Sequence, residues 1–121
     1  MSAWVYIAVG AVGGAGAVAR FLLDGLVSLR AGRDFPLGTL VVNLSGTFLL
    51  GLCLGASLRG DALAIVGTGT LGSYTTFSTW MFESHRLAED GQVGSAAVNL
   101  VLSVVVGVSA AALGRALGEA L

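Results

Sequence analysis

The charged residues of this chain fall in a few short clusters, and the stretches between them are long and uncharged. The uncharged runs cover residues 1–19, 35–58, 62–82 and 91–114, which are 19, 24, 21 and 24 residues long. A helix that crosses a hydrocarbon core of about 30 Å needs about 20 predominantly apolar residues. The sequence therefore predicts four transmembrane helices, over roughly 3–28, 36–58, 62–84 and 92–117.

The composition excludes most soluble classes. Only 11% of the residues are charged, whereas soluble domains typically carry about 25%. The polar segments 29–35, 59–61 and 83–90 are short enough to join neighbouring helices, so residues 1–121 form one all-α membrane domain. The first run lacks a positively charged start and is expected to stay as a helix rather than serve as a cleaved signal. A net charge of −1 offers no basic surface for nucleic acid. We expect a multi-pass protein of the cell (inner) membrane.

The arginines do not choose an orientation. With four crossings, Arg59 and Arg115 share a side with both termini, and Arg30, Arg33 and Arg86 lie on the other side. Orientation follows the Lys/Arg imbalance of the loops, which is nearly absent here. Two explanations stay open. Either these few charges carry no information, or the chain inserts both ways round and pairs as an antiparallel dual-topology homodimer.

Small residues recur four positions apart, a spacing that lets helix backbones approach closely in lipid. The pairs are Gly10 with Gly14, Gly51 with Gly55, and Gly114 with Gly118.

The third run has an unusual composition. Residues 67–80 hold three glycines, five threonines, two serines and a tyrosine. Such a segment favours local unwinding, and non-helical backbone at membrane depth is tolerated only inside protein or along a polar cavity. We therefore expect a broken helix with its break near Gly72 to Thr75. Carbonyls freed by such breaks bind cations in membrane proteins.

Two further spans carry polar residues on one face. Asn43 and Thr47 are four apart, as are Asn99 and Ser103. Such groups at membrane depth either serve function or form interhelical hydrogen bonds.

Phe77 and Trp80 share a helix face after the expected break. The spacing alone is compatible with ordinary packing. Aromatic rings, however, have positive edges, and ring edges beside Asn, Ser and Thr donors can hold a small dehydrated anion without trapping it.

Three segments in order resemble the Fluc (CrcB) family of fluoride channels: GGAGAVARF at 13–21, PLGTLVVNLSGTF at 36–48 and GSYTTFST at 72–79. The resemblance covers nearly the whole chain. It implies an antiparallel dual-topology homodimer, or a pair of homologues, with two fluoride pores and one central structural Na⁺.

The resemblance also assigns residues. It implies that backbone carbonyls of Gly72 and Thr75 hold the Na⁺, and that Arg20 lies in an electropositive vestibule. The implied ion path contains Asn43, Thr76, Phe77, Thr79, Trp80 and Ser103. The chain departs from the family where Trp80 replaces a phenylalanine, Asn99 replaces a common tyrosine, and Gly107 and Ala111 replace hydroxyl residues of some members.

The expected function is passive fluoride export, which lowers cytoplasmic fluoride toxicity and requires no enzyme chemistry. The sequence has no triad or metal-ligand pattern, and its one histidine, His85, is expected in a polar loop. An alternative is a small proton-coupled multidrug exporter, which needs a carboxylate inside the membrane, whereas Asp24 and Glu83 are expected near helix ends. A third possibility is a non-transporting assembly factor, which would leave the polar centre of the third span without a role.

Overall fold

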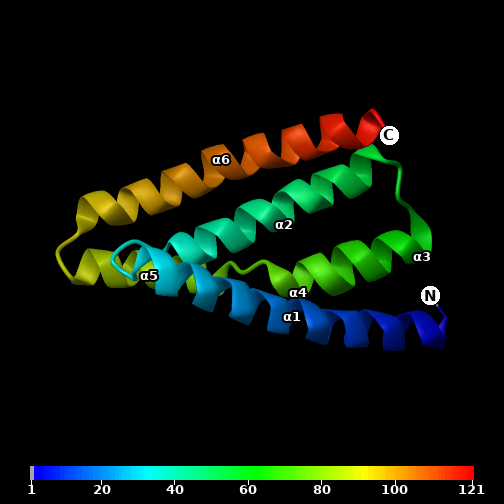
Figure 1. The fold of residues 1–121 in the computed structure, drawn as a ribbon, viewed down its shortest axis with the longest axis horizontal. Coiled ribbons are helices and arrows are strands. Elements are labelled where there is room, and N and C mark those ends of the chain that lie inside the picture. Colours follow the sequence, from blue (N-terminus) through cyan, green and yellow to red (C-terminus); the bar gives the residue numbers. More distant parts are fainter. Residues whose placement is uncertain (1) are drawn as a thin grey trace.

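A computed structural model describes residues 2–121, which form four long helical segments joined by short connections (Figure 1). Three of these segments are continuous helices: α1 (Ala3–Ala31), α2 (Leu37–Gly55) and α6 (Val93–Glu119). Each is long and apolar enough to cross a membrane. The predicted all-helical architecture is therefore confirmed at this level.

The helix ends follow local chemistry. Helix α1 continues to Ala31, beyond the expected residue 28, and stops at Gly32, whose φ of 81° favours glycine. Pro36 precedes α2, and a proline is well suited to the start of a helix because it has no N–H to leave unpaired. Helix α2 ends at Gly55 rather than at the expected residue 58.

The third segment consists of four pieces. A short helix α3 (Gly60–Leu63) leads into a π-helical stretch η1 (Ala64–Leu71), then α4 (Gly72–Tyr74), and after an interruption α5 (Ser78–Glu89). Gly72 is helical, so the break lies at residues 75–77 and not around Gly72. Within the interval where the break was expected, Thr75 has an extended backbone, with ψ of 159°. The wide turns of η1 lie just before this break, and π-helical turns are frequent at functional sites.

Helices α2 and α6 pack closely along their length (Figure 1). A Cβ atom on Gly114 would meet the Phe48 carbonyl, and one on Gly51 would meet the Ala111 carbonyl. Gly55 and Gly118 make the same kind of approach. These two glycine pairs thus bring the backbones together as their spacing predicted.

The glycine pair on α1 behaves differently. Gly10 and Gly14 have open space where a Cβ would lie, so in this chain they do not form a close approach. Gly13 and Gly16 instead face η1, where a Cβ on Gly16 would lie 2.5 Å from the Thr70 carbonyl oxygen.

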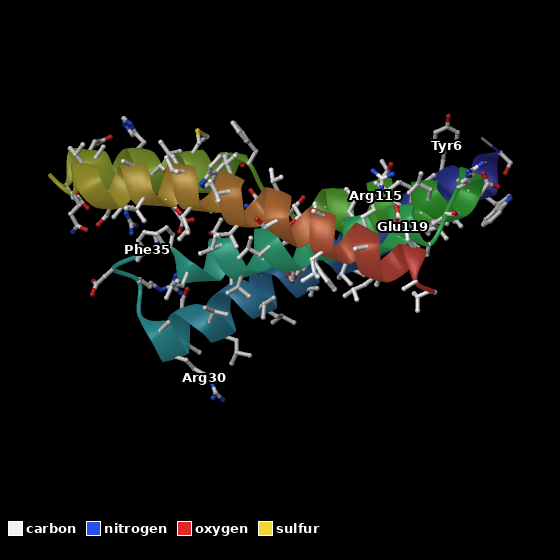
Figure 2. The ribbon with its side chains drawn as sticks, turned by 90° about the horizontal axis from the view of Figure 1, so that it is seen from above. Tyr6, Arg30, Phe35, Arg115 and Glu119 are labelled. Atoms are coloured by element: carbon white, nitrogen blue, oxygen red, sulfur yellow. The ribbon has the colours of Figure 1, made fainter. Side chains whose placement is uncertain are left out.

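The outer surface is strongly apolar. Leucine, valine and phenylalanine side chains are exposed along all the long helices, and among the described residues only five hydrophobic side chains are buried. Both chain ends lie at one end of the bundle (Figure 1). Figure 2 places Arg115 and Glu119 at that end and Arg30 at the opposite end. This surface is typical of a multi-pass membrane protein.

Candidate functional site

The break in the third segment is held by Asn43 of α2. The Asn43 side-chain Nδ2 donates to the Thr76 carbonyl at 2.8 Å, and the Thr76 N–H donates to Asn43 Oδ1 at 2.8 Å. The amide therefore pairs with both backbone groups of one residue that lies outside the helices. An amide nitrogen carries two donors, and the bond to Thr76 uses one of them.

This pairing leaves two backbone carbonyls of the third segment without the hydrogen bonds that a continuous helix would give them. In an unbroken helix the Thr76 N–H would donate to the Gly72 carbonyl, but here it donates to Asn43. Likewise the Thr79 N–H, which would serve the Thr75 carbonyl, donates to the Thr76 hydroxyl at 3.2 Å. The carbonyls of Gly72 and Thr75, which the family resemblance assigns to the cation, have thus lost their helical donors.

Aromatic side chains follow directly after the break. Phe77 is 69% exposed, and its ring meets that of Trp80 edge to face, with centroids 5.6 Å apart and planes at 78°. An exposed ring beside a polar backbone turn presents an edge of positive potential next to neutral donors.

A groove of about 750 Å³ opens beside the break between α2, the third segment and α6. Its lining includes most of the side chains expected along the ion path: Asn43, Thr76, Phe77, Trp80 and Ser103. Farther along α6 the lining is Gly107, Val108 and Ala111, which supply no hydroxyl. The remaining polar side chains of the lining are Thr47 on α2, Thr68 in η1 and Thr75 at the break.

Arg20 and Thr79 lie on a second, smaller cavity of about 190 Å³. Thr76, the residue that Asn43 holds, lines both cavities. Asp24, which the sequence reading placed near a loop, lines the smaller cavity together with Arg20. The arginine therefore has a carboxylate for a neighbour in the expected vestibule.

The sequence reading missed a polar contact between α2 and α5. The Thr39 hydroxyl is buried and donates to Glu83 Oε1 at 2.5 Å. Thr39 is four residues before Asn43, so the helical spacing could have placed both on one face. Glu83, expected at a helix end, lies within α5.

Ionisable groups form no metal site in the part of the chain that the structure describes. Residues 2–121 contain no cluster of three or more His, Cys, Asp or Glu side chains that could hold a metal ion. His85 lies within α5, not in a loop as expected, and forms an exposed pair with Glu89.

Three membrane-length helices, a fourth segment that is interrupted, and polar groups gathered at the interruption define a multi-pass membrane protein built like a channel or transporter. Residues 7–115 match the model of the family described as CrcB-like protein, Camphor Resistance (CrcB). The chain belongs to this family.

Relatives of the chain are similar over almost their whole lengths. Fluoride-specific ion channel FluC 2 of Mycolicibacterium paratuberculosis is 51% identical over 115 residues, covering 95% of this chain and 94% of the relative. The FluC 2 protein of Mycobacterium tuberculosis is 52% identical over 111 residues, covering 92% and 88%. FluC 1 of Leifsonia xyli is 45% identical over 122 residues, covering 98% and 89%. All three are named as ion channels, not as enzymes or exporters.

Proposed function

We propose that this protein is a fluoride-specific ion channel that lets fluoride leave the cytoplasm passively across the cell (inner) membrane. Family membership and relatives named as fluoride-specific channels support this function. The observation that carries it is the clamp between Asn43 and Thr76, which sets an amide donor beside the exposed ring of Phe77. Neutral donors and ring edges bind a small anion weakly enough for it to leave again.

The proposed ion path runs along the large groove. Asn43 and Phe77 line it, and Thr76, Trp80 and Ser103 contribute to the same lining. Thr79 and Arg20 lie on the smaller cavity, which would serve as the vestibule. An arginine there raises the local concentration of anions, and the carboxylate of Asp24 moderates that attraction.

The groove is open along one side of the single chain, and we assign the missing wall to a second copy. An antiparallel homodimer with its twofold axis in the membrane plane would close two equivalent grooves. The balanced arginines agree with insertion in both orientations. The chain would act as one transmembrane domain over residues 1–121.

The same break suits a structural Na⁺. Carbonyls of Gly72 and Thr75 have lost their helical donors, because Thr76 and Thr79 donate elsewhere. Carbonyl oxygen is a hard ligand of the kind that cations find at broken membrane helices. Two such carbonyls from each of two copies would surround one cation on the twofold axis.

The decisive experiment measures fluoride efflux from liposomes that contain only the purified protein. Fluoride should leave rapidly, and chloride-loaded liposomes should stay sealed. Absent fluoride efflux, or chloride efflux of equal rate, would overturn the proposal. Reporter fusions at the C-terminus test the dual topology separately, because a signal from only one side of the membrane contradicts it.

A further inference from the structure

Trp80 is tied to α6 by a closed set of hydrogen bonds. Its indole Nε1–H donates to the Asn99 backbone carbonyl at 3.2 Å. The Asn99 side-chain Nδ2 donates to Ser84 Oγ at 2.8 Å, and the Ser84 hydroxyl donates to the Trp80 carbonyl at 2.8 Å. Trp80 is therefore connected to Asn99 of α6 twice: its side chain directly, and its backbone carbonyl through Ser84.

The two partners of Trp80 are enclosed within the protein. Asn99 is only 2% exposed and Ser84 is 5% exposed. Neither lines the large groove, whereas Trp80 does. Buried hydrogen bonds of this kind are costly to break, because a group left without a partner also loses its contact with water.

We infer that Ser84 and Asn99 are positioning residues that turn the indole N–H of Trp80 away from the ion path. This inference rests on the proposed fluoride conduction. A free indole N–H is a hydrogen-bond donor that would hold a dehydrated anion. Because that donor is used on Asn99, Trp80 offers the groove only its carbon ring, as a phenylalanine would.

The arrangement also sets the angle of the ring. The indole is held near perpendicular to the Phe77 ring, at 78°. If the tether to α6 is lost, the indole can rotate about its side-chain bonds and bring its N–H into the groove. Fluoride would then be bound more tightly and released more slowly.

The first test reads the hydrogen bond itself. The chain has two tryptophans, and Trp4 is 59% exposed on α1. In the Trp4→Phe protein the single indole N–H signal belongs to Trp80, and we expect it to exchange with deuterium more slowly than the Trp4 signal of Trp80→Phe. Ser84→Ala and Asn99→Leu keep the Asn99 backbone carbonyl but remove the bond from Asn99 to Ser84 that fixes it against α5. Each should therefore speed the Trp80 exchange about fivefold, the scale for losing one net hydrogen bond.

The second test reads fluoride efflux. Ser84→Ala and Asn99→Leu should slow efflux about fivefold, while Ser109→Ala serves as a matched control because its hydroxyl bonds only within α6. Trp80→Phe lacks the indole N–H, so its own efflux rate is the reference for the double variants. Adding Ser84→Ala or Asn99→Leu to Trp80→Phe should then cause no further loss, because no indole N–H remains to be positioned.

The outcomes separate the two hypotheses. A wild-type protein that carries no fluoride overturns the proposed function, whatever the indole exchange shows. A conducting wild type whose Trp80 N–H exchanges as fast as that of Trp4 overturns the positioning inference without any variant. Losses of efflux that are equal with the native Trp80 and in the Trp80→Phe protein would assign Ser84 and Asn99 a purely structural role and overturn it as well.

Discussion

The Asn43 side chain takes the place of the helix at Thr76. It donates to the Thr76 carbonyl and accepts from the Thr76 N–H, both at 2.8 Å, across a separation of 33 residues. The backbone groups of a non-helical residue inside a membrane protein need partners, and here one amide supplies both for Thr76. The clamp keeps the third segment broken and places Phe77 at the edge of the groove.

Two substitutions of Asn43 should distinguish its role in holding the break from its role in binding the anion. Asn43→Ala removes both bonds to Thr76, whereas Asn43→Asp keeps an acceptor for the Thr76 N–H and loses the donor. Both variants should lower fluoride efflux about 100-fold, the scale for removing one preorganised donor that faces an anion. Asn43→Ala should also lower the free energy of unfolding by about 1–3 kcal/mol, and Asn43→Asp by less. Liposome efflux and thermal unfolding measure the two effects, and unchanged efflux in both variants would place the path elsewhere.

Phe77 should matter for conduction far more than for folding. Its side chain is 69% exposed, so Phe77→Ile removes a ring edge from the groove and little packing within the chain. Efflux should fall to the level of protein-free liposomes, while the elution volume in size-exclusion chromatography stays that of the wild type. Phe82→Ile is the matched control, because Phe82 lies on α5 with 65% exposure and does not line the groove. A Phe77→Ile protein that conducts normally is incompatible with a path past this ring.

Sodium should stabilise the protein through the break. If the freed carbonyls hold Na⁺, a Na⁺ concentration 100-fold above its Kd adds about 2.7 kcal/mol to the free energy of unfolding. Replacing Na⁺ by N-methylglucamine should therefore lower the Tm.

Asn43→Ala provides the control for this measurement. In that variant the Thr76 N–H can return to the Gly72 carbonyl, so the dependence of the Tm on Na⁺ should be lost. A wild-type Tm that is the same in both salts would contradict a cation site at these carbonyls.

The sequence predicted the helical segments better than the contacts between them. Charge-free runs locate spans because each span must be long and apolar, and this constraint is local. The break was expected near Gly72 to Thr75, and Thr75 lies in it. Gly72, however, remains in α4, because the residue that Asn43 binds from another helix is Thr76. Likewise the spacing of Gly10 and Gly14 matches that of the close-packed pairs, and only the three-dimensional arrangement shows that α1 packs through Gly13 and Gly16.

The packing of α2 on α6 allows a test within one helix. A methyl group on Gly114 would meet the Phe48 carbonyl, whereas one on Gly107, seven residues earlier, meets open space within the chain. Gly114→Ala should therefore destabilise the protein by about 1–3 kcal/mol through overpacking. Gly107→Ala should leave the stability within about 1 kcal/mol of the wild type, because alanine favours a helix over glycine.

The same two substitutions should have the opposite order of effects on conduction. Because Gly107 lines the groove and Gly114 does not, Gly107→Ala should slow fluoride efflux. Thermal unfolding and efflux on the same two proteins measure both effects. Equal destabilisation by the two substitutions would show that α6 is not held against α2 by close backbone contact at Gly114.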